Sequence, residues 1–406
     1  MAEMDMGLSP QNNKNNNGKK RKKKKKQNLF MSIVTGLIPW KGDSVTEVFR
    51  KIIFLASLII LVVAVVLILN HVLLITSDPN QVTVSNPDAS QGETADSPTY
   101  IVDLKNQTPT QEQLEQLPEG TVNEEYAALY EANNDFVGWI TIDGTNINYP
   151  VLQSGDISTF EPCLSKTRYG ICEFCDQIEA NPELAKQFYL HHDYNRYYLF
   201  DGNIFADFDG KFTPDSMPNN TILYGHNMLY KHQFSALTNY NNNINFLKAS
   251  PVIDFNTMYK NNKYKIFSVF ITNVSEELGE VFDYYNYVDY DNSSEFYNYI
   301  LECMDRSIYE TGVDIKYGDE ILTLSTCDAS TGFQEDMRLI VVARKVRENE
   351  NPTVDTSKIV RKTSVKYFDA YYAAYGNKWK GRTWDVSLVQ GMAEYLKENG
   401  LEDPAE

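Results

Sequence analysis

The chain has 406 residues, a formal net charge of −18 at pH 7 and a sequence pI of about 4.8. Positive charge is concentrated at the N-terminus, because residues 1–51 carry a net charge of +8 and residues 52–406 carry −26. The acidic surplus of the larger part argues against binding to nucleic acid, which requires a positive surface.

The N-terminal region has the pattern of a retained membrane anchor. Residues 19–26 read KKRKKKKK, and an uncharged run from Ile52 to Leu69 continues in apolar character to Ile75. As a helix with a rise of ~1.5 Å per residue, 24 residues reach ~36 Å, enough to cross a hydrocarbon core of ~30 Å. The run is longer than the apolar region of a cleaved signal peptide, and no small-residue cleavage pattern follows closely. We therefore expect a single-pass protein of the cell membrane, with a basic cytoplasmic tail (1–51), an anchor (52–75) and the remainder outside the cell.

The extracellular part begins with a polar segment, residues 76–110, that predicts a flexible stalk. Apolar residues between 111 and 130 then predict one or two short helices. From Val137, β-branched and aromatic runs alternate with turns, which predicts seven or eight strands in a closed antiparallel barrel or a sandwich. A doubly wound α/β sheet is disfavoured because most connections are loops. The predicted strand regions are 138–153, 202–208, 221–226, 250–257, 263–274, 320–327 and 337–346.

One long amphipathic helix is predicted between two late strands. Phe296, Ile300, Met304 and Ile308 recur every four residues, and Asn292 or Ser293 is the expected N-cap. Cys303 lies near the apolar face of this helix, so we expect a buried thiol that behaves as a small hydrophobic side chain.

Two segments are additions to the predicted barrel. Residues 154–187 form an acidic, loop-like insertion with Cys163, Cys172 and Cys175, and two histidines, His191 and His192, follow it. This spacing is compatible with a zinc site, a disulfide or three uncommitted thiols. Residues 347–406 form a polar connector and a helical segment that is expected to begin at Asp385 and stop at Gly400, and the composition does not assign them a role.

Cys327 is the candidate nucleophile. All five cysteines lie in the predicted extracellular part, where an odd number leaves at least one free thiol or one intermolecular bond. A thiol nucleophile needs a base or cation nearby and donors for the oxyanion. His226 follows a strand region and is the candidate base, with His191 and His192 as competitors. Arg338, eleven residues after Cys327, would lie at the same barrel end if the two strands are antiparallel neighbours, and its guanidinium could bind an oxyanion. Its alternative role is an ordinary surface ion pair.

Three motifs together resemble the signature of sortases, the membrane-anchored transpeptidases of Gram-positive surfaces. TLSTC ends at Cys327 with Arg338 downstream, and LYGHNM contains His226 about 100 residues upstream. NNDFVGWITIDGTNINYPVLQ, FYLHHDYN and the long helix before the cysteine strand resemble class B members. The resemblance covers roughly residues 125–346.

The resemblance implies a mostly β (α+β) fold, a closed eight-stranded barrel within a catalytic domain of residues 111–346. It also implies cleavage of a C-terminal LPxTG- or NPxTx-type sorting signal on surface proteins. Cys327 would form a thioacyl-enzyme, and an amine of a peptidoglycan precursor would resolve it. His226 would transfer protons, and Arg338 would hold the substrate and stabilise the oxyanion. No cofactor or metal is implied for this reaction.

Accessory roles and alternative functions remain open at the level of sequence. Ser325 and Thr326 are expected either to line the substrate groove or to be structural, and Asp328 is a candidate for steering His226. A pilin-polymerising sortase usually carries a lid segment and often a second membrane span, and neither pattern is found. An inactive sortase-like surface binding module would show ordinary thiol reactivity at Cys327.

Overall fold

The computed structural model describes residues 38–75 apart from Trp40, and residues 105–402 apart from 106, 156, 157, 159, 228–232, 329, 331–335 and 377. The chain divides into two units, Met1–Thr76 and Ser77–Glu406. The basic run 19–26 and residues 76–104 of the predicted stalk lie outside the described residues.

The predicted anchor lies within one helix, α2 (Val45–Ile75). The helix begins seven residues earlier than the apolar run, because the Ser44 hydroxyl accepts a hydrogen bond from the backbone of Glu47 and Lys51 pairs with Asp43 at 2.7 Å. Among the described residues, α2 is the single helix long and apolar enough to cross a membrane.

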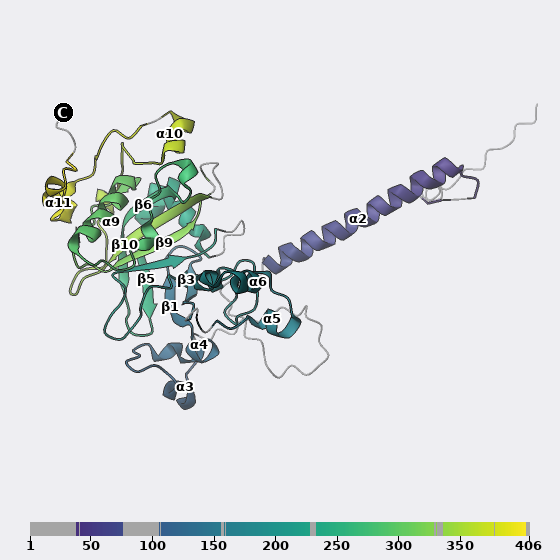
Figure 1. Ribbon diagram of the computed structural model, residues 1–406, viewed down its shortest axis with the longest axis horizontal. Helices are drawn as coiled ribbons and strands as arrows, with labels where there is room; N and C mark the ends of the chain where they lie inside the picture. Colours follow the sequence, from purple (N-terminus) through teal and green to yellow (C-terminus); the bar gives the residue numbers. More distant parts are fainter. Residues whose placement is uncertain are drawn as a thin grey trace, which may run out of the picture. The chain divides into compact units, whose positions relative to one another are not determined.

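The larger unit contains a closed barrel of eight strands, which confirms the predicted architecture (Figure 1). Neighbouring strands follow the order β1-β2-β3-β4-β9-β10-β6-β5 around the barrel. The strands are β1 (Phe136–Thr141), β2 (Asn148–Leu152), β3 (Phe205–Ala206), β4 (Asn220–Tyr224), β5 (Val252–Thr257), β6 (Lys263–Asn273), β9 (Ile321–Cys327) and β10 (Met337–Lys345).

The expectation of a wholly antiparallel barrel was wrong at two pairings. β2 runs parallel to β3, and β4 runs parallel to β9 over five residue pairs, from Asn220↔Ile321 to Tyr224↔Ser325. Parallel neighbours need a long crossover connection, and here the chain between β4 and β9 includes β5, β6 and a helix. Local sequence patterns predict strands but not which distant strands become neighbours.

Alternating residues of the strands face two separate apolar cores. Leu322 and Leu324 of β9 pack inside the barrel, whereas Ile321 packs in an outer core beneath helix α9 (Ser293–Arg306). Period-two alternation is expected when both faces of a strand are covered by different layers. The outer face of β9 is therefore the face that carries its odd-numbered residues.

Helix α9 begins as predicted and ends before the predicted last turn. Asn292 is the N-cap and its side chain accepts from the backbone N–H of Glu295 at 3.1 Å. The helix ends at Arg306, so Ile308 is not part of its apolar stripe: its N–H donates to the Val269 carbonyl, and its side chain enters the barrel core. Cys303 is fully buried in the outer core, as expected.

The insertion is helical, and the prediction of a loop was wrong. It contains α5 (Leu164–Tyr169), α6 (Glu173–Ala180) and a 3-10 segment, η4 (Pro182–Leu190). Phe174 and Ile178 of α6 pack with Phe188 in a third core, together with residues of β1 and of α4 (Ala127–Ala132). The helices are too short for a clear periodic pattern, so their packing is visible only in three dimensions.

The C-terminal extension adds short strands at the edge of the domain. β11 (Val360–Arg361) pairs with β7 (Tyr309–Glu310), and β12 (Val389–Gln390) pairs with β8 (Ile315–Lys316). Trp384, Val389, Met392 and Leu396 complete the outer core. The extension therefore covers one face of the barrel, over α9 (Figure 1).

The predicted start of the last helix was wrong. Asp385 caps only a 3-10 turn, η10 (Val386–Leu388), and α11 (Met392–Glu398) begins after Gly391, which has φ 89°. The end agrees with the prediction, because Gly400 follows the helix with φ 64°. The other helical elements are α3 (Gln111–Glu115), η2 (Glu124–Tyr126), η5 (Phe234–Leu237), α7 (Thr238–Asn242), α8 (Ile244–Ala249), η6 (Glu276–Leu278), η7 (Tyr284–Asn286), η9 (Thr356–Lys358) and α10 (Asp369–Tyr375).

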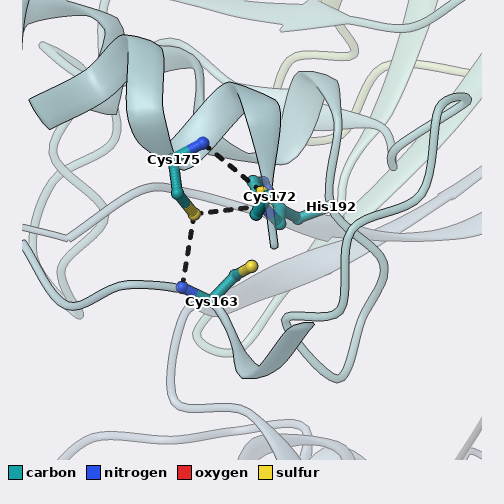
Figure 2. Close-up of side chains that lie close together, drawn as sticks. All are labelled: Cys163, Cys172, Cys175 and His192. Atoms are coloured by element: carbon teal, nitrogen blue, oxygen red, sulfur yellow. Dashed lines mark hydrogen bonds between the residues drawn. The ribbon is translucent and has the colours of Figure 1, made fainter. Parts of the chain in front are cut away.

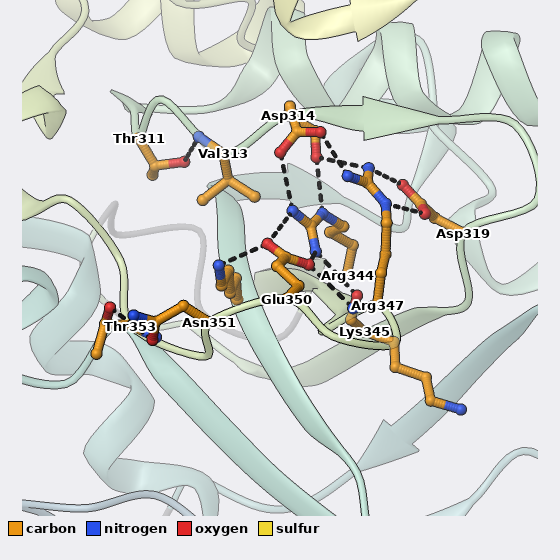
Figure 3. Close-up of polar contacts among 11 residues, drawn as sticks. Thr311, Val313, Asp314, Asp319, Arg344, Lys345, Arg347, Glu350, Asn351 and Thr353 are labelled. Carbon is orange, nitrogen blue, oxygen red and sulfur yellow. Dashed lines mark hydrogen bonds and ion pairs between the residues drawn. The ribbon is translucent and has the colours of Figure 1, made fainter.

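An ion-pair network lies at the C-terminal end of β10, opposite to the end that carries Arg338 (Figure 3). The side chain of Arg344 is 1% exposed and pairs with Glu350 at 2.6 Å and with Asp314 at 2.9 Å. Hydrogen bonds from Arg344 hold the pKa of the Glu350 carboxyl well below its usual range. Arg347 extends the network to Asp319.

Candidate active site

Strand register brings Cys327 and Arg338 together. Cys327 is the last residue of β9, Arg338 is the second residue of β10, and the two are direct partners in the antiparallel ladder. Directly opposed residues point to the same face of a sheet, with side chains close enough to interact. The sequence-based expectation that both lie at one end of the barrel is confirmed.

His226 reaches the same end from the other side of β9. β4 pairs with β9 up to Tyr224↔Ser325, and the ladder continues because the Gly225 N–H donates to the Ser325 carbonyl at 3.2 Å. His226 is therefore beside Cys327 in the next row. Since adjacent strands lie ~4.8 Å apart, the backbones of the three residues fall within about two strand spacings, ~10 Å.

All three residues belong to the outer face of the barrel. Ile321 and Ile222 pack in the outer core, and Cys327 and His226 follow them at even spacing along their strands. Each of Cys327, His226 and Arg338 is half-buried, so solvent reaches the site. The other four cysteines are buried.

The imidazole of His226 is held by a main-chain carbonyl. Its Nε2 lies 3.0 Å from the Leu190 carbonyl, which can only accept, so Nε2 carries a proton and Nδ1 is the nitrogen left for proton exchange. Its backbone N–H donates to Gln233 at 2.8 Å. The imidazole ring of His191 lies 5.8 Å away.

Burial lowers the pKa of His226, and the hydrogen bond to Leu190 opposes that shift. The positive charge of Arg338 lowers this pKa further, whereas the carboxylate of Asp201 raises it. The imidazole is consequently neutral at pH 7 in the resting protein, and its protonated form is a minor population.

The predicted accessory residues make structural hydrogen bonds. The Ser325 hydroxyl bonds to the buried Tyr284 hydroxyl at 2.7 Å, and the Thr326 hydroxyl donates to the Gly225 carbonyl at 2.7 Å. The Thr326 bond ties β9 to β4 immediately behind His226 and Cys327.

Asp328 lies in the turn that follows Cys327. It is buried, and its carboxylate accepts from the side chain of Ser330 at 2.7 Å and from the backbone N–H of the same residue. Desolvation raises its pKa. Within the described part of the chain, the hydrogen bonds of its carboxylate are to Ser330 and none reaches His226.

Sequence reasoning missed two residues that position the site. The Asn227 side chain donates to the Cys327 carbonyl at 2.9 Å. Gln233 has a positive φ of 48°, donates from Nε2 to the carbonyls of Asp201 and Gly202 and accepts from the His226 N–H, so it ties the backbone of His226 to that of residues 201–202. Asn227 belongs to the LYGHNM motif, but nothing in the sequence around Gln233 distinguishes it.

The competing histidines have other environments. His192 is fully buried, its ring stacks on Phe188 at 3.8 Å, and its Nε2 lies beside the sulfur atoms of Cys172 and Cys175. His191 is half-buried, and its Nδ1 lies 2.9 Å from the Phe200 carbonyl. Cys163 completes this buried cluster with Cys172, Cys175 and His192.

Comparisons with known proteins identify the family. A family model described as "Sortase domain" matches residues 182–346. Sortase B of Listeria monocytogenes is 29% identical over 221 residues, which cover 54% of this chain and 74% of the relative. Sortase B of Staphylococcus aureus is 28% identical over 225 residues, which cover 55% and 75%. A solved structure of Clostridium perfringens sortase B is 27% identical, covers 54% of this chain and 98% of its own, and has a TM-score of 0.41.

The residues that the family model matches include His226, Cys327 and Arg338, so residues 182–346 form a sortase domain, the domain of a family of cysteine transpeptidases, and its curated relatives are class B sortases.

Proposed function

We propose that this transpeptidase cleaves a C-terminal sorting signal of surface proteins with Cys327 as nucleophile, His226 as proton carrier and Arg338 as oxyanion donor. The observation that carries the proposal is the register of three adjacent strands, which aligns the three residues at one half-buried end of the barrel. The predicted signal is of the LPxTG or NPxTx type.

In the first half-reaction, the Cys327 thiolate attacks the carbonyl carbon of the threonine in the signal. The guanidinium of Arg338 donates hydrogen bonds to the oxyanion that forms. The tetrahedral species collapses, the peptide C–N bond breaks, and the imidazolium of His226 gives its proton to the leaving amine. The product is a thioester between Cys327 and the surface protein.

In the second half-reaction, an amine of a peptidoglycan precursor attacks the thioester. Neutral His226 takes the proton of the attacking nitrogen, the new amide bond forms, and the thiolate of Cys327 leaves. The reactive state is the thiolate–imidazolium pair, a minor population because burial lowers the pKa of His226.

The segment that begins after β6 is the candidate binding surface for the signal. Tyr284 of this segment contacts Ser325, two residues before the nucleophile. Residues of the same segment, among them Glu276, Asp283 and Tyr285, line an open cavity of about 670 Å³. A peptide bound there would lie next to the outer face of β9.

The protein acts at the outer surface of the cell membrane in this proposal. The length and apolar composition of α2 support a single membrane anchor, and the basic residues before it support a cytoplasmic N-terminus. The catalytic domain would then lie outside, where surface proteins and peptidoglycan precursors are found.

The function is tested with fluorogenic peptides that carry several sorting motifs. Cys327→Ala should abolish cleavage, His226→Ala should lower kcat/KM by ~10²–10⁴-fold, and Arg338→Ala by ~10²–10³-fold. Arg361→Ala, a substitution on an exposed strand of the extension, should leave kcat/KM unchanged and serves as the matched arginine control.

Two outcomes would contradict the proposal. If wild type cleaves no peptide and Cys327 alkylates at the rate of free cysteine, the protein is a binding module with a sortase fold. If cleavage is intact but the products are polymers of one surface protein, the protein is a pilin-polymerising sortase.

A further inference from the structure

Four potential metal ligands converge between the insertion and the segment that follows it, outside the site of the proposed transpeptidation (Figure 2). They are Cys163 before α5, Cys172 and Cys175 at the start of α6, and His192 after η4. All four residues are buried, and their ligand atoms lie within 4.8 Å of one another.

The distances are those of a tetrahedral zinc site. Zn–S bonds of ~2.3 Å and Zn–N bonds of ~2.0–2.1 Å at tetrahedral angles place sulfur and nitrogen ligands ~3.6 Å apart. His192 Nε2 lies 3.5 Å from Cys172 Sγ and 3.7 Å from Cys175 Sγ. All four ligand atoms lie within 4.8 Å of one another, compared with ~3.8 Å between two sulfur ligands of a tetrahedral zinc ion, so small side-chain shifts complete the site.

His192 is oriented as a zinc ligand. Its Nδ1 lies 2.7 Å from the Phe188 carbonyl, and because a carbonyl only accepts, Nδ1 carries the proton. The lone pair of Nε2 is therefore directed at the sulfur atoms. Metal-bound histidines commonly donate their other N–H to a carbonyl in this way, which fixes both the tautomer and the ring plane.

Each sulfur atom accepts a backbone N–H. Lys166 donates to Cys163, Cys175 donates to Cys172, and Cys163 donates to Cys175, each at 3.4 Å. These bonds favour sulfur as thiolate, the form that binds metal. Three thiolates and Zn²⁺ leave one negative charge, which the three donors partly compensate.

We propose that Cys163, Cys172, Cys175 and His192 bind one structural zinc ion. Three sulfur atoms and one imidazole nitrogen are soft and borderline ligands, which suit Zn²⁺ and not Ca²⁺ or Mg²⁺. Four protein ligands in a buried site leave no open position, which is typical of a structural ion. Binding displaces the thiol protons to solvent.

The ion would restrict the movement of the segment around Leu190, which binds the catalytic base His226. His192 is two residues after Leu190, and the carbonyl of Leu190 fixes the imidazole of His226. Zinc would join α5 and α6 to this segment. This consequence for catalysis rests on the proposed function, whereas zinc binding itself does not.

Zinc content tests the inference directly. The full-length chain is purified in mild detergent under reducing conditions, and its zinc is measured by inductively coupled plasma mass spectrometry. We expect one zinc ion per chain. Cys172→Ser and His192→Gln should lower zinc affinity by at least ~100-fold in competition with a chromophoric chelator. Cys303→Ser and His191→Gln are the matched controls and should retain the ion.

A second measurement does not depend on the folding of variants. Co²⁺ bound to the metal-depleted wild type should give the visible bands of a tetrahedral site and thiolate-to-cobalt charge transfer. An octahedral spectrum, no uptake of Co²⁺ or Zn²⁺, or a disulfide within the cluster detected by mass after alkylation would overturn the inference.

These experiments can contradict the zinc site and the proposed function independently of each other. Cys327→Ala should lose cleavage and keep its zinc. If wild type holds zinc and cleaves no sorting peptide, the proposed function is wrong and the zinc site stands. If wild type cleaves peptide with a disulfide in place of zinc, the zinc site is wrong and the proposed function stands.

Discussion

His226 has its proton affinity set by groups on three different segments. Burial and the positive charge of Arg338 lower its pKa, whereas the Leu190 carbonyl and Asp201 raise it. If the reactive state needs a protonated imidazole and a thiolate, acid converts the pair to thiol and imidazolium. The decrease of kcat/KM at low pH, its acid limb, should therefore have its midpoint below pH ~6.5, the ordinary pKa of histidine.

Substitutions beside His226 should move this acid limb in opposite directions. His191 lowers the pKa of His226, so His191→Gln should raise it and shift the limb to higher pH. Asp201→Asn removes a negative charge and should shift the limb to lower pH. The C2 proton of His226, followed by NMR over the same pH range, reports the same two shifts.

Equal acid limbs in wild type and both variants would show that His226 does not control the rate. Shifts in the NMR titration without shifts in the rate profile would assign the acid limb to another group.

At the scale of elements, the parallel contact between β4 and β9 places His226 beside Cys327. Thr326 donates to the Gly225 carbonyl, and Asn227 donates to the Cys327 carbonyl, so side chains of each strand bind the backbone of the other. Both bonds hold His226 at a fixed distance from Cys327.

Thr326→Val should reduce activity more than a purely structural substitution does. It keeps the shape of the side chain, leaves the buried Gly225 carbonyl without its donor and costs ~1–3 kcal/mol of unfolding free energy. We expect kcat/KM to fall by about tenfold, as for a misplaced base. Thr326→Ser should restore both values.

Thr323→Val is the matched control on the same strand. Its hydroxyl bonds to Asn220 and Tyr299 farther from the site, so it should lose similar stability in urea unfolding and keep its kcat/KM. Equal losses of activity in Thr323→Val and Thr326→Val would contradict a positioning role.

The C-terminal extension is fastened to α9 by a buried ion pair. Asp305 of α9 accepts from Arg382 at 3.1 Å and from the Trp384 indole at 2.7 Å, and both members of the ion pair are nearly inaccessible. Breaking a buried pair leaves an uncompensated charge in the protein interior.

Arg382→Met should lower the free energy of unfolding by ~3–5 kcal/mol, because Asp305 keeps its charge and loses its cation. Lys263→Met, at the exposed pair with Asp254, should cost less than ~1 kcal/mol. Urea unfolding followed by tryptophan fluorescence measures both. A loss below 1 kcal/mol for Arg382→Met would mean that the extension does not stabilise the barrel.

At the scale of the whole molecule, local sequence patterns predicted the strands but not all of their neighbours. Runs such as ILTLSTC and MRLIVVARK are β-branched and apolar on both faces, which is why β9 and β10 were recognisable. The parallel β4–β9 contact joins residues about 100 positions apart, and chain-local propensity carries no information about it.

The residues of the candidate site that could be predicted are those with a reactive or charged side chain at the end of a recognisable strand. Cys327, His226 and Arg338 each end or begin a recognisable strand region. Gln233 was not predictable, because its role depends on a backbone turn with positive φ. The choice of His192 over His191 for the cysteine cluster depends on the end of η4, which the sequence does not define.

The orientation of the full chain in the membrane can be tested in intact cells. Proteinase added to intact cells should remove the part that begins at Ser77 and leave the basic N-terminus with α2 in the membrane fraction, since cytoplasmic flanks are enriched in Lys and Arg. An epitope at each end, detected before and after permeabilisation, gives the orientation. Protection of the C-terminal epitope in intact cells would reverse the proposed orientation, and recovery of the whole chain in the soluble fraction would exclude an anchor.

The most direct test of the account is the intact mass of the protein after incubation with a sorting peptide and no amine acceptor. We predict an acyl adduct that maps to Cys327, that disappears on addition of an amine with release of the joined product, and that does not form in His226→Ala on the same timescale. Turnover of the peptide with no adduct on Cys327, or an adduct that forms equally fast without His226, would contradict a shared thiol–imidazole site at this end of the barrel.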